Sequence, residues 1–473
     1  MQAQRWTLAV VCTATAMLML DIAVVNTALS DIAVDLDTGL SGLQWVVDAY
    51  TLALAATVLT AGALADRLGR RKLFLAGLGI FTVSSLGCAL AGDIAFLNGM
   101  RAVQGIGAAI MFAVSLALLA AAYPDMRQRA GALAAYGATI GASFAVGPLV
   151  GGALTSGIDW QWVFLINIPI GIFALWITFR HVVESRDDRA RRVDWLGQIT
   201  LTLGLALLVL GLLRGNEDGW TSTPIVLELG GALAFLAAFV LVESRVREPM
   251  LPLGLFRRKS FTGAQIAAFS ISASMFAVYS YATLYLQGVL GLSAIDAGLV
   301  LVPGTVLNFV VAGATAQILE RGVRPGALIT AGLALSAAGM ALMTLAGVDS
   351  SWTALLPGMM VGMVGVGLFN PAVIAVALDG IPEEQSGLAA GVNDTARQAG
   401  IAVGVAGLGA LIPSGSALGG NPVEYVDGLH NALLAGAGVA AVGAVAAALL
   451  IGVRRGSRSA SSAVHAQLAT EAA

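Results

Sequence analysis

The chain has 473 residues, of which 58% are hydrophobic and only 11% are charged. Soluble domains carry roughly twice that charged fraction, so the composition excludes a soluble globular protein. The net charge of −3 says little, because what matters in such a chain is where the charges lie. Both cysteines, Cys12 and Cys88, fall within apolar runs, and neither a disulfide framework nor a metal site is expected.

Apolar stretches long enough to cross a bilayer, which takes about 20 residues each, occur along the whole chain. The sequence therefore predicts an all-α membrane protein with 14 transmembrane helices. The predicted spans are residues 7–27, 43–64, 73–91, 95–121, 130–153, 160–179, 195–213, 224–243, 262–287, 295–317, 325–345, 352–377, 388–411 and 429–452.

The basic residues predict how these spans are oriented. Of the 25 Lys and Arg residues, all but Arg101, Arg214 and Arg397 fall in the terminal segments or in the loops on the same side as the termini. Because basic residues concentrate in cytoplasmic loops, we expect a multi-pass protein of the cell membrane with both termini in the cytoplasm.

Charged stretches and a weak internal repeat suggest how the chain is divided. We expect six-helix bundles over residues 1–180 and 257–455, joined by a linker over 181–256 with two extra helices that face lipid. A Ser- and Ala-rich tail over 456–473 is predicted to be disordered. The stretch from Gly313 to Arg321 follows the second span of the second bundle, and the loop from Gly62 to Lys72 occupies the same place in the first bundle. Such a repeat is expected for a transporter built from two related halves.

That earlier loop is short and densely charged, and it joins the second and third spans. Its sequence, G-A-L-A-D-R-L-G-R-R-K, forms a tight hairpin on the cytoplasmic side. The residues that define the motif are Gly62, Asp66, Arg67, Gly69, Arg70 and Arg71.

Three ionisable residues lie inside the first, second and fourth spans: Asp21, Asp48 and Arg101. Charged groups in the bilayer are costly, so they face the bundle interior or a water-filled cavity and pair with one another. We expect the three to share one layer, with Asp21 and Arg101 as an ion pair. A purely structural ion pair that fixes helix packing is the alternative interpretation.

The fifth span contains closely spaced glycines and a proline: Gly147, Pro148, Gly151 and Gly152. Small residues four apart let helices approach closely, and this pattern is found in ordinary tight packing as well.

Polar, aromatic and thioether side chains of several spans are candidates for lining a substrate cavity, although ordinary packing would place them equally well. In the thirteenth span Asp394 is also a candidate proton carrier. It lies three residues before Arg397, so the two share a helix face and an alternative is that they only neutralise each other. The cavity candidates are Asn26, Tyr281, Tyr285, Gln287, Asn308, Met363, Asn370, Asn393 and Arg397.

The sequence carries no phosphate-binding G-x-x-x-x-G-K-[ST] motif, only two lysines, and no catalytic constellation. We therefore expect neither an ATP-driven motor nor an enzyme, and no cofactor, metal or nucleic-acid partner. Any uphill transport would use a proton gradient through carboxylates buried in the membrane.

These motifs together resemble the fourteen-span drug:proton antiporter branch of the major facilitator superfamily. The likeness is carried by Leu20-Asp21, the Gly62–Lys72 loop, Arg101 with Gln104-Gly105, and Gly147-Pro148 with Gly151-Gly152. It implies that Asp21 exchanges the proton and Arg101 modulates it, while Asp66 and the neighbouring arginines latch the two halves on the cytoplasmic face. The Gly-Pro motif is similar to the one that marks antiporters in this superfamily.

The expected function is proton-coupled export of drugs or antibiotic-like amphipathic compounds by alternating access, performed by a monomer. The main alternative is a proton-coupled symporter that imports a small nutrient. A membrane enzyme or receptor is a further alternative, which would need a catalytic constellation or a sizeable soluble domain.

Overall fold

The computed structural model describes residues 2–186, 193–381, 386–413, 416 and 420–452. Its regular secondary structure within these residues is helical, as the sequence predicts. Thirteen helices in the described part are long and apolar enough to cross a membrane. A further helix, α15 (Ser386–Gly409), has 24 residues and is also of membrane length. The tail predicted to be disordered, residues 456–473, lies outside the described residues.

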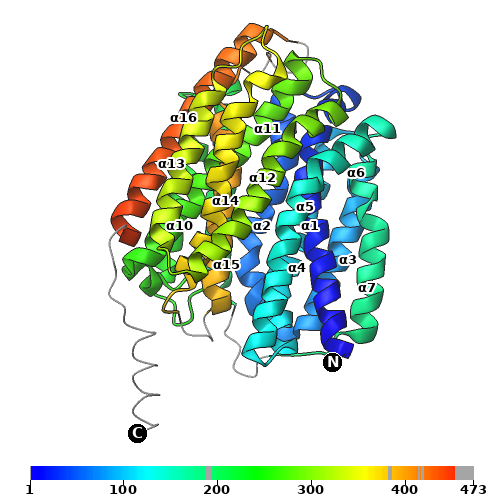
Figure 1. The fold of residues 1–473 in the computed structure, drawn as a ribbon, viewed down its shortest axis with the longest axis vertical. Helices are drawn as coiled ribbons and strands as arrows, with labels where there is room; N and C mark the ends of the chain where they lie inside the picture. The colour runs from blue at the N-terminus through cyan, green and yellow to red at the C-terminus, as the bar shows by residue number, and fades with distance from the viewer. Residues whose placement is uncertain (1, 187–192, 382–385, 414–415, 417–419, 453–473) are drawn as a thin grey trace.

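The N-terminal half consists of helices that run up and down through the bundle and pack on one another (Figure 1). Within it α1 packs on α5, and α4 packs between α2 and α3. Its elements are α1 (Gln2–Asp35), α2 (Leu40–Leu68), α3 (Arg70–Ala89), α4 (Ile94–Ala122), α5 (Met126–Gly157), α6 (Trp162–Leu165) and α7 (Asn167–His181).

The C-terminal half forms a second bundle, in which α13 packs on α14 and α16. Its first long helix is interrupted by a π-helical turn, η2, and ends in another, η3; such turns often occur at functional sites. Its elements are η1 (Leu253–Arg257), α10 (Lys259–Ile271), η2 (Ser272–Phe276), α11 (Ala277–Leu284), η3 (Tyr285–Val289), α12 (Ala294–Glu320), α13 (Pro325–Met343), η4 (Trp352–Ala354), α14 (Leu356–Leu378), α15, α16 (Pro422–Ala447) and η6 (Ala448–Gly452).

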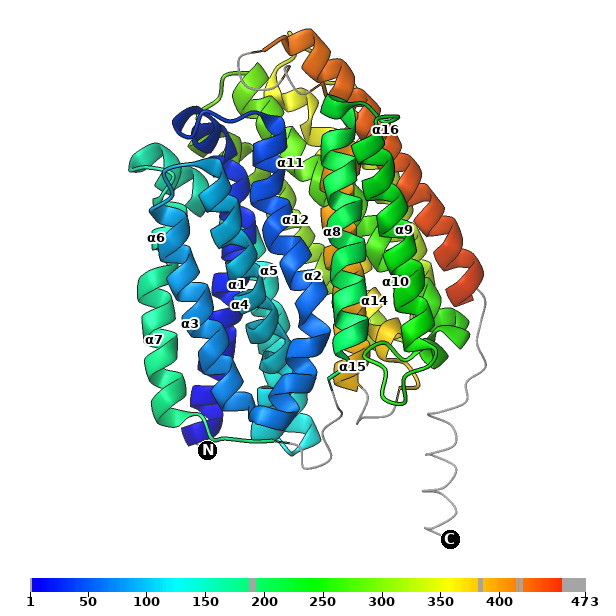
Figure 2. The ribbon, with the colours of Figure 1, turned by 180° about the vertical axis from the view of Figure 1, so that it is seen from behind.

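Two inserted helices, α8 (Trp195–Asp218) and α9 (Thr223–Glu243), stand side by side on the face of the bundle that Figure 2 turns toward the viewer. The expectation that both only face lipid is wrong for α8, which packs on α2 and on α15. Buried Gln198 of α8 donates to the Ala56 carbonyl of α2 at 2.8 Å and accepts a hydrogen bond from Thr60. α8 therefore covers the line where the two halves meet at α2 and α15, and α9 packs on α8.

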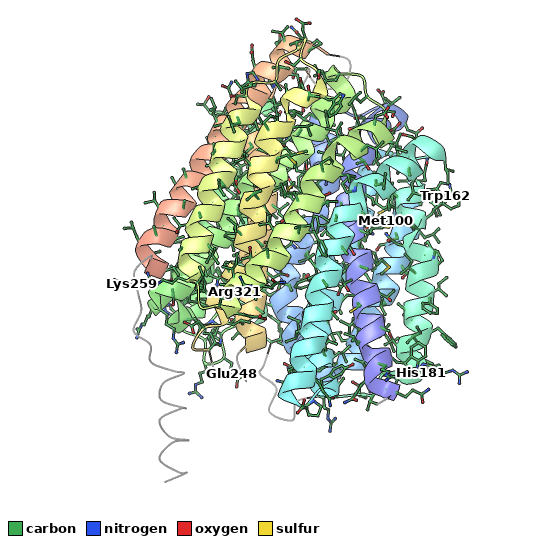
Figure 3. The ribbon with its side chains drawn as sticks, viewed as in Figure 1. Met100, Trp162, His181, Glu248, Lys259 and Arg321 are labelled. Carbon is green, nitrogen blue, oxygen red and sulfur yellow. The ribbon has the colours of Figure 1, made fainter. Side chains whose placement is uncertain are left out.

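The two ends of the bundle differ in their side chains (Figure 3). His181, Glu248, Lys259 and Arg321 lie at the end where the chain begins, which we call the terminal end, and Trp162 lies toward the opposite or far end. Successive helices alternate in direction, so α2 and α12 both begin at the far end.

The two halves touch along two helix pairs, α2 with α15 and α5 with α12. Hydrogen bonds join them in the far part of the bundle: Gln44 donates to the Tyr281 hydroxyl at 2.8 Å, and Ser280 donates to the Asn26 side-chain oxygen at 2.5 Å. Apolar residues near the far ends of α1 and α2 belong to the same buried cluster as the core of the C-terminal half. This conformation is therefore closed at the far end.

Candidate functional site

The core of the N-terminal half contains an ion pair that the sequence predicts. Arg101 of α4 donates from Nη1 to Asp21 Oδ2 of α1 at 2.7 Å. Both side chains are buried, with exposed fractions of 2% and 0%. Breaking a buried pair is far more costly than the net stability the pair provides, so the two residues constrain each other strongly.

Neutral side chains complete the hydrogen bonding of the pair. Asp21 Oδ1 accepts from Gln104 and from Asn167, each at 2.9 Å. Gln104 Nε2 also donates to Ser85 at 2.8 Å, and Gln104 Oε1 accepts from Arg101 at 2.6 Å. The carboxylate thus takes three donors from α4 and α7 and faces the bundle interior, as expected, with no exposure to solvent in this conformation.

Aromatic rings and a backbone carbonyl enclose the guanidinium. Arg101 lies 4.3 Å from the ring centroid of Tyr50 and 5.7 Å from that of Phe164, and its Nε donates to the Val46 carbonyl at 2.9 Å. A desolvated cation over an aromatic face gains about 2 kcal/mol. The cation is therefore stabilised by α2 and α6 as well as by Asp21.

Sequence reasoning did not assign Ser85 or the amides Gln104 and Asn167 to this cluster. The three come from α3, α4 and α7, and only the packing of these helices brings them together. The sequence signal for each of them was a polar residue within an otherwise apolar span. Gln104 also lies three residues after Arg101, on the same helix face.

Asp48 lies in α2 and makes no hydrogen bond with the Asp21–Arg101 pair. It is fully buried, and neither carboxylate oxygen has a hydrogen-bond partner among the described residues. Its electrostatic neighbour is Tyr281 of the C-terminal half, so Asp48 faces the boundary between the halves.

Asp394 and Arg397 lie on α15, as predicted, but Asp394 Oδ2 has no hydrogen-bond partner among the described residues. Asp394 is buried and lies within electrostatic range of Tyr50 and Tyr136 in the N-terminal half. Tyr50 also interacts with Asp21 and Arg101. Tyr50 therefore interacts electrostatically with the Asp21–Arg101 pair of the N-terminal half and with Asp394 of the C-terminal half.

Several of the predicted cavity residues instead form the closed far end. Asn26 accepts from Ser280, Tyr281 donates to the Val405 carbonyl, and Gln287 donates to the Thr27 carbonyl at 3.0 Å. The last of these bonds also joins the two halves. These contacts assign Asn26, Tyr281 and Gln287 to the contact between the halves in this conformation.

The remaining cavity candidates lie within the C-terminal half. Tyr285 donates to the Gly347 carbonyl at 2.7 Å, and Asn393 donates to Gln265 at 3.1 Å. Met363 packs beside Gly304 of α12, where it fills a tight helix contact. Asn308, Asn370 and Arg397 are partly buried, and Asn308 Oδ1 has no hydrogen-bond partner in the described part.

The glycines of α5 face two different helices. A Cβ on Gly147 would lie 2.3 Å from the Ala23 Cβ of α1, within the same half. A Cβ on Gly152 would lie 2.5 Å from the Ala294 carbonyl oxygen of α12, in the other half. The motif therefore lets α5 approach both α1 and α12 closely. Gly152 permits the approach to α12, which closes the far end.

Replacing Gly152 with alanine is expected to shift the protein away from the conformation described here. The added methyl group meets backbone, which cannot rotate away, so the closed far end loses about 1–3 kcal/mol relative to the open one. The distance between fluorophores on Val34→Cys and Ser351→Cys, at the far ends of the two halves, measures this shift by single-molecule energy transfer.

Gly147→Ala is the matched control, because its methyl group meets a helix of the same half. It is expected to lower stability without changing the distribution of distances between positions 34 and 351. The labelled protein needs Cys12 and Cys88 replaced. Equal shifts in both variants would show that the α5–α12 contact does not govern closure.

The charged loop between α2 and α3 makes its described contacts within the N-terminal half and with the segment that directly follows it. Asp66 pairs with Arg70 at 2.8 Å, and Arg71 donates to the Phe179 carbonyl. Gly69 has φ +108°, a conformation that side chains rarely adopt, and it is the single residue between the two helices. The predicted latch between halves is thus not formed here through these contacts.

Glu184 is a residue of this loop region that sequence reasoning missed. Its carboxylate accepts the backbone N–H groups of Arg71 at 3.0 Å and of Lys72 at 3.2 Å. These N–H groups open α3, and a carboxylate is favourable at a helix N-terminus. An acid in the charged run after the sixth span was the only signal in the sequence.

Two helical halves of membrane-length helices, packed on each other along α2–α15 and α5–α12, with a buried ion pair in the first half, are the arrangement of a multi-pass membrane transporter. The family model described as Major Facilitator Superfamily matches residues 11–405. The chain belongs to this superfamily and is a transporter rather than an enzyme.

Its curated relatives include exporters and resistance proteins. The methylenomycin A resistance protein of Streptomyces coelicolor is 35% identical over 401 residues, covering 85% of this chain and 84% of the relative. The cephamycin export protein CmcT of Amycolatopsis lactamdurans is 35% identical over 432 residues, covering 90% and 88%. A crystal structure of a POT family transporter in complex with a thioalcohol-conjugated peptide matches with a TM-score of 0.69 at 14% identity, covering 93% of this chain and 94% of that one. That structure supports the fold.

Proposed function

We propose that this protein exports an amphipathic, antibiotic-like compound in exchange for protons, by alternating access across the cell membrane. The observation that carries the proposal is the buried pair of Asp21 and Arg101, in a chain whose relatives are named for resistance and export. An ionisable pair inside a membrane protein is expensive and is by default a functional site.

Closure of the far end is expected in the step in which an exporter loads its substrate. Lys259 and Arg321 lie at the terminal end (Figure 3), and basic residues favour the cytoplasmic side. With that orientation the closed far end faces outward, and both termini lie in the cytoplasm. Substrate then reaches the protein from the cytoplasm, and opening of the far end releases it outside.

In this mechanism Asp21 carries the exchanged proton, and Arg101 is the counter-charge of the ionised carboxylate. When Asp21 is ionised, the pair is neutral as a unit; when Asp21 takes up a proton, Arg101 keeps an uncompensated charge in the core. That difference in free energy is large enough to favour another packing of the helices. Because Asp21 is buried here, proton exchange belongs to a conformation in which water reaches it.

Two further acids and the charged loop have proposed roles in the same cycle. Asp48 and Asp394 lack full hydrogen bonding and face the boundary between the halves, which suits proton uptake when the halves separate. Asp66 and its arginines would latch the terminal ends together in the opposite conformation.

Transport in vesicles tests the proposal. Purified protein is reconstituted in liposomes that contain a pH-sensitive dye, and a gradient of methylenomycin A or of ethidium is imposed. We expect protons to move opposite to the compound. Protons that move with the compound would establish the symporter alternative, and movement of the compound without protons would refute coupling.

A further inference from the structure

The membrane-facing side of the N-terminal half contains a groove of about 390 Å³. It lies where α2 and α4 meet the inserted helix α8, and this volume is within the range of sites that hold small organic ligands. The residues that define it include Trp45, Ala53 and Thr57 of α2, Asn98 and Ile106 of α4, and Thr202 of α8.

Alanines make the groove. Ala49, Ala53 and Ala56 follow one another on one face of α2, and Ala102 stands opposite on α4. Larger side chains at these positions would fill the space between the two helices and α8. The groove is separate from the Asp21 pair, which lies in the interior of the same half.

The dimensions of the groove match one leaflet of a bilayer. From Trp45 to Thr57 the lining of α2 runs over about 18 Å at 1.5 Å per residue, and one leaflet contributes about 15 Å of hydrocarbon. Ile106 in the lining and its neighbour Val103 are exposed on α4. In a membrane-spanning helix such exposed apolar side chains face lipid.

The polar groups lie where a lipid headgroup would be. Trp45 and Asn98 are near the far-end starts of α2 and α4, and tryptophan is enriched at this depth. The side-chain oxygen of Asn98 is buried at the edge of the groove and has no hydrogen-bond partner among the described residues. A headgroup hydroxyl or ammonium that enters the groove and displaces the side chain slightly would supply the missing donor.

We propose that this groove binds the acyl chain of a phospholipid from the leaflet at the far end, with the headgroup at Asn98. The lipid fills the space between the N-terminal half and α8, which is otherwise held to α2 through Gln198 and Thr60. This inference does not depend on the transported compound or on proton coupling.

Photo-crosslinking tests the site. The full chain is reconstituted in phosphatidylethanolamine and phosphatidylglycerol vesicles with a trace of phosphatidylethanolamine that carries a diazirine near the end of its acyl chain. We expect labelling of residues 45–57 and 98–106 to exceed labelling of the exposed face of α9 by at least about threefold, since a bound lipid stays in place longer than a freely exchanging one.

Variants that fill the groove provide the second readout. Ala53→Leu and Ala102→Leu are each expected to reduce labelling of these segments to the level of α9, whereas Ala237→Leu, at an exposed position of α9, is expected to leave it unchanged. Equal labelling of all membrane-facing segments in the unaltered protein would refute the site without any variant. Displacement of the label by ethidium or methylenomycin A would show that the groove holds a transported compound instead.

Discussion

Asp21→Asn is expected to reduce drug transport driven by a pH gradient by at least about tenfold, which corresponds to a loss of about 1.4 kcal/mol or more in the driving step. Asparagine keeps the size of the side chain and can still bond to Gln104 and Asn167. It cannot take up or release a proton at physiological pH. Initial rates of ethidium uptake into inverted membrane vesicles measure the effect.

A double variant separates coupling from folding. In Asp21→Asn alone the Arg101 charge is buried without its partner, and poor folding would mimic a loss of coupling. Asp21→Asn with Arg101→Gln removes both charges, and it is expected to restore stability and leave transport absent. Transport at the unaltered rate in either protein would exclude Asp21 as the group that exchanges the proton.

Arg101→Ala is expected to lower the free energy of unfolding by about 3–5 kcal/mol, because it leaves a buried carboxylate without its counter-charge. The change also removes the stacking on Tyr50 and the hydrogen bond to the Val46 carbonyl. Denaturant unfolding in detergent micelles, followed by tryptophan fluorescence, measures the difference.

Arg214 provides the matched control for this measurement. It forms ion pairs with Asp218 and Glu228, but 40% of its side chain is exposed. Pairs of this kind contribute about 0–1 kcal/mol, so Arg214→Ala is expected to change stability little. A similar cost for Arg101→Ala and Arg214→Ala would mean that water or other donors compensate the buried carboxylate.

The sequence predicts the membrane class, the succession of helices and one contact of the site. Apolar runs of bilayer length predict transmembrane helices, because in a helix the backbone N–H and C=O groups form their hydrogen bonds within the segment and need no water. The Asp21–Arg101 pair was predictable because a charged side chain inside the bilayer needs a partner of opposite charge. Few charged residues lie inside the predicted spans, so few pairings were possible. The predicted ends differ where helices extend beyond the apolar run, as in α5, which reaches Gly157.

Other parts of the site were beyond sequence reasoning. Asp48 and Arg101 both lie near the far end, yet only Arg101 contacts Asp21, because the direction of a side chain around its helix depends on how that helix packs. For the same reason Tyr281 and Asn26, predicted to line a cavity, form hydrogen bonds between the halves. Polarity marked these residues as unusual without indicating their partners.

The sequence by itself determined that the chain crosses a membrane many times and that its buried charges include one acid matched to one arginine, since hydropathy and charge are properties of residues. Only the tertiary structure decided that Gln104, Asn167 and Ser85 complete the site, that α8 packs on α2, and that the far end is closed. These features depend on contacts between residues from about 20 to more than 200 positions apart in the chain, and such contacts are set by helix packing rather than by local pattern.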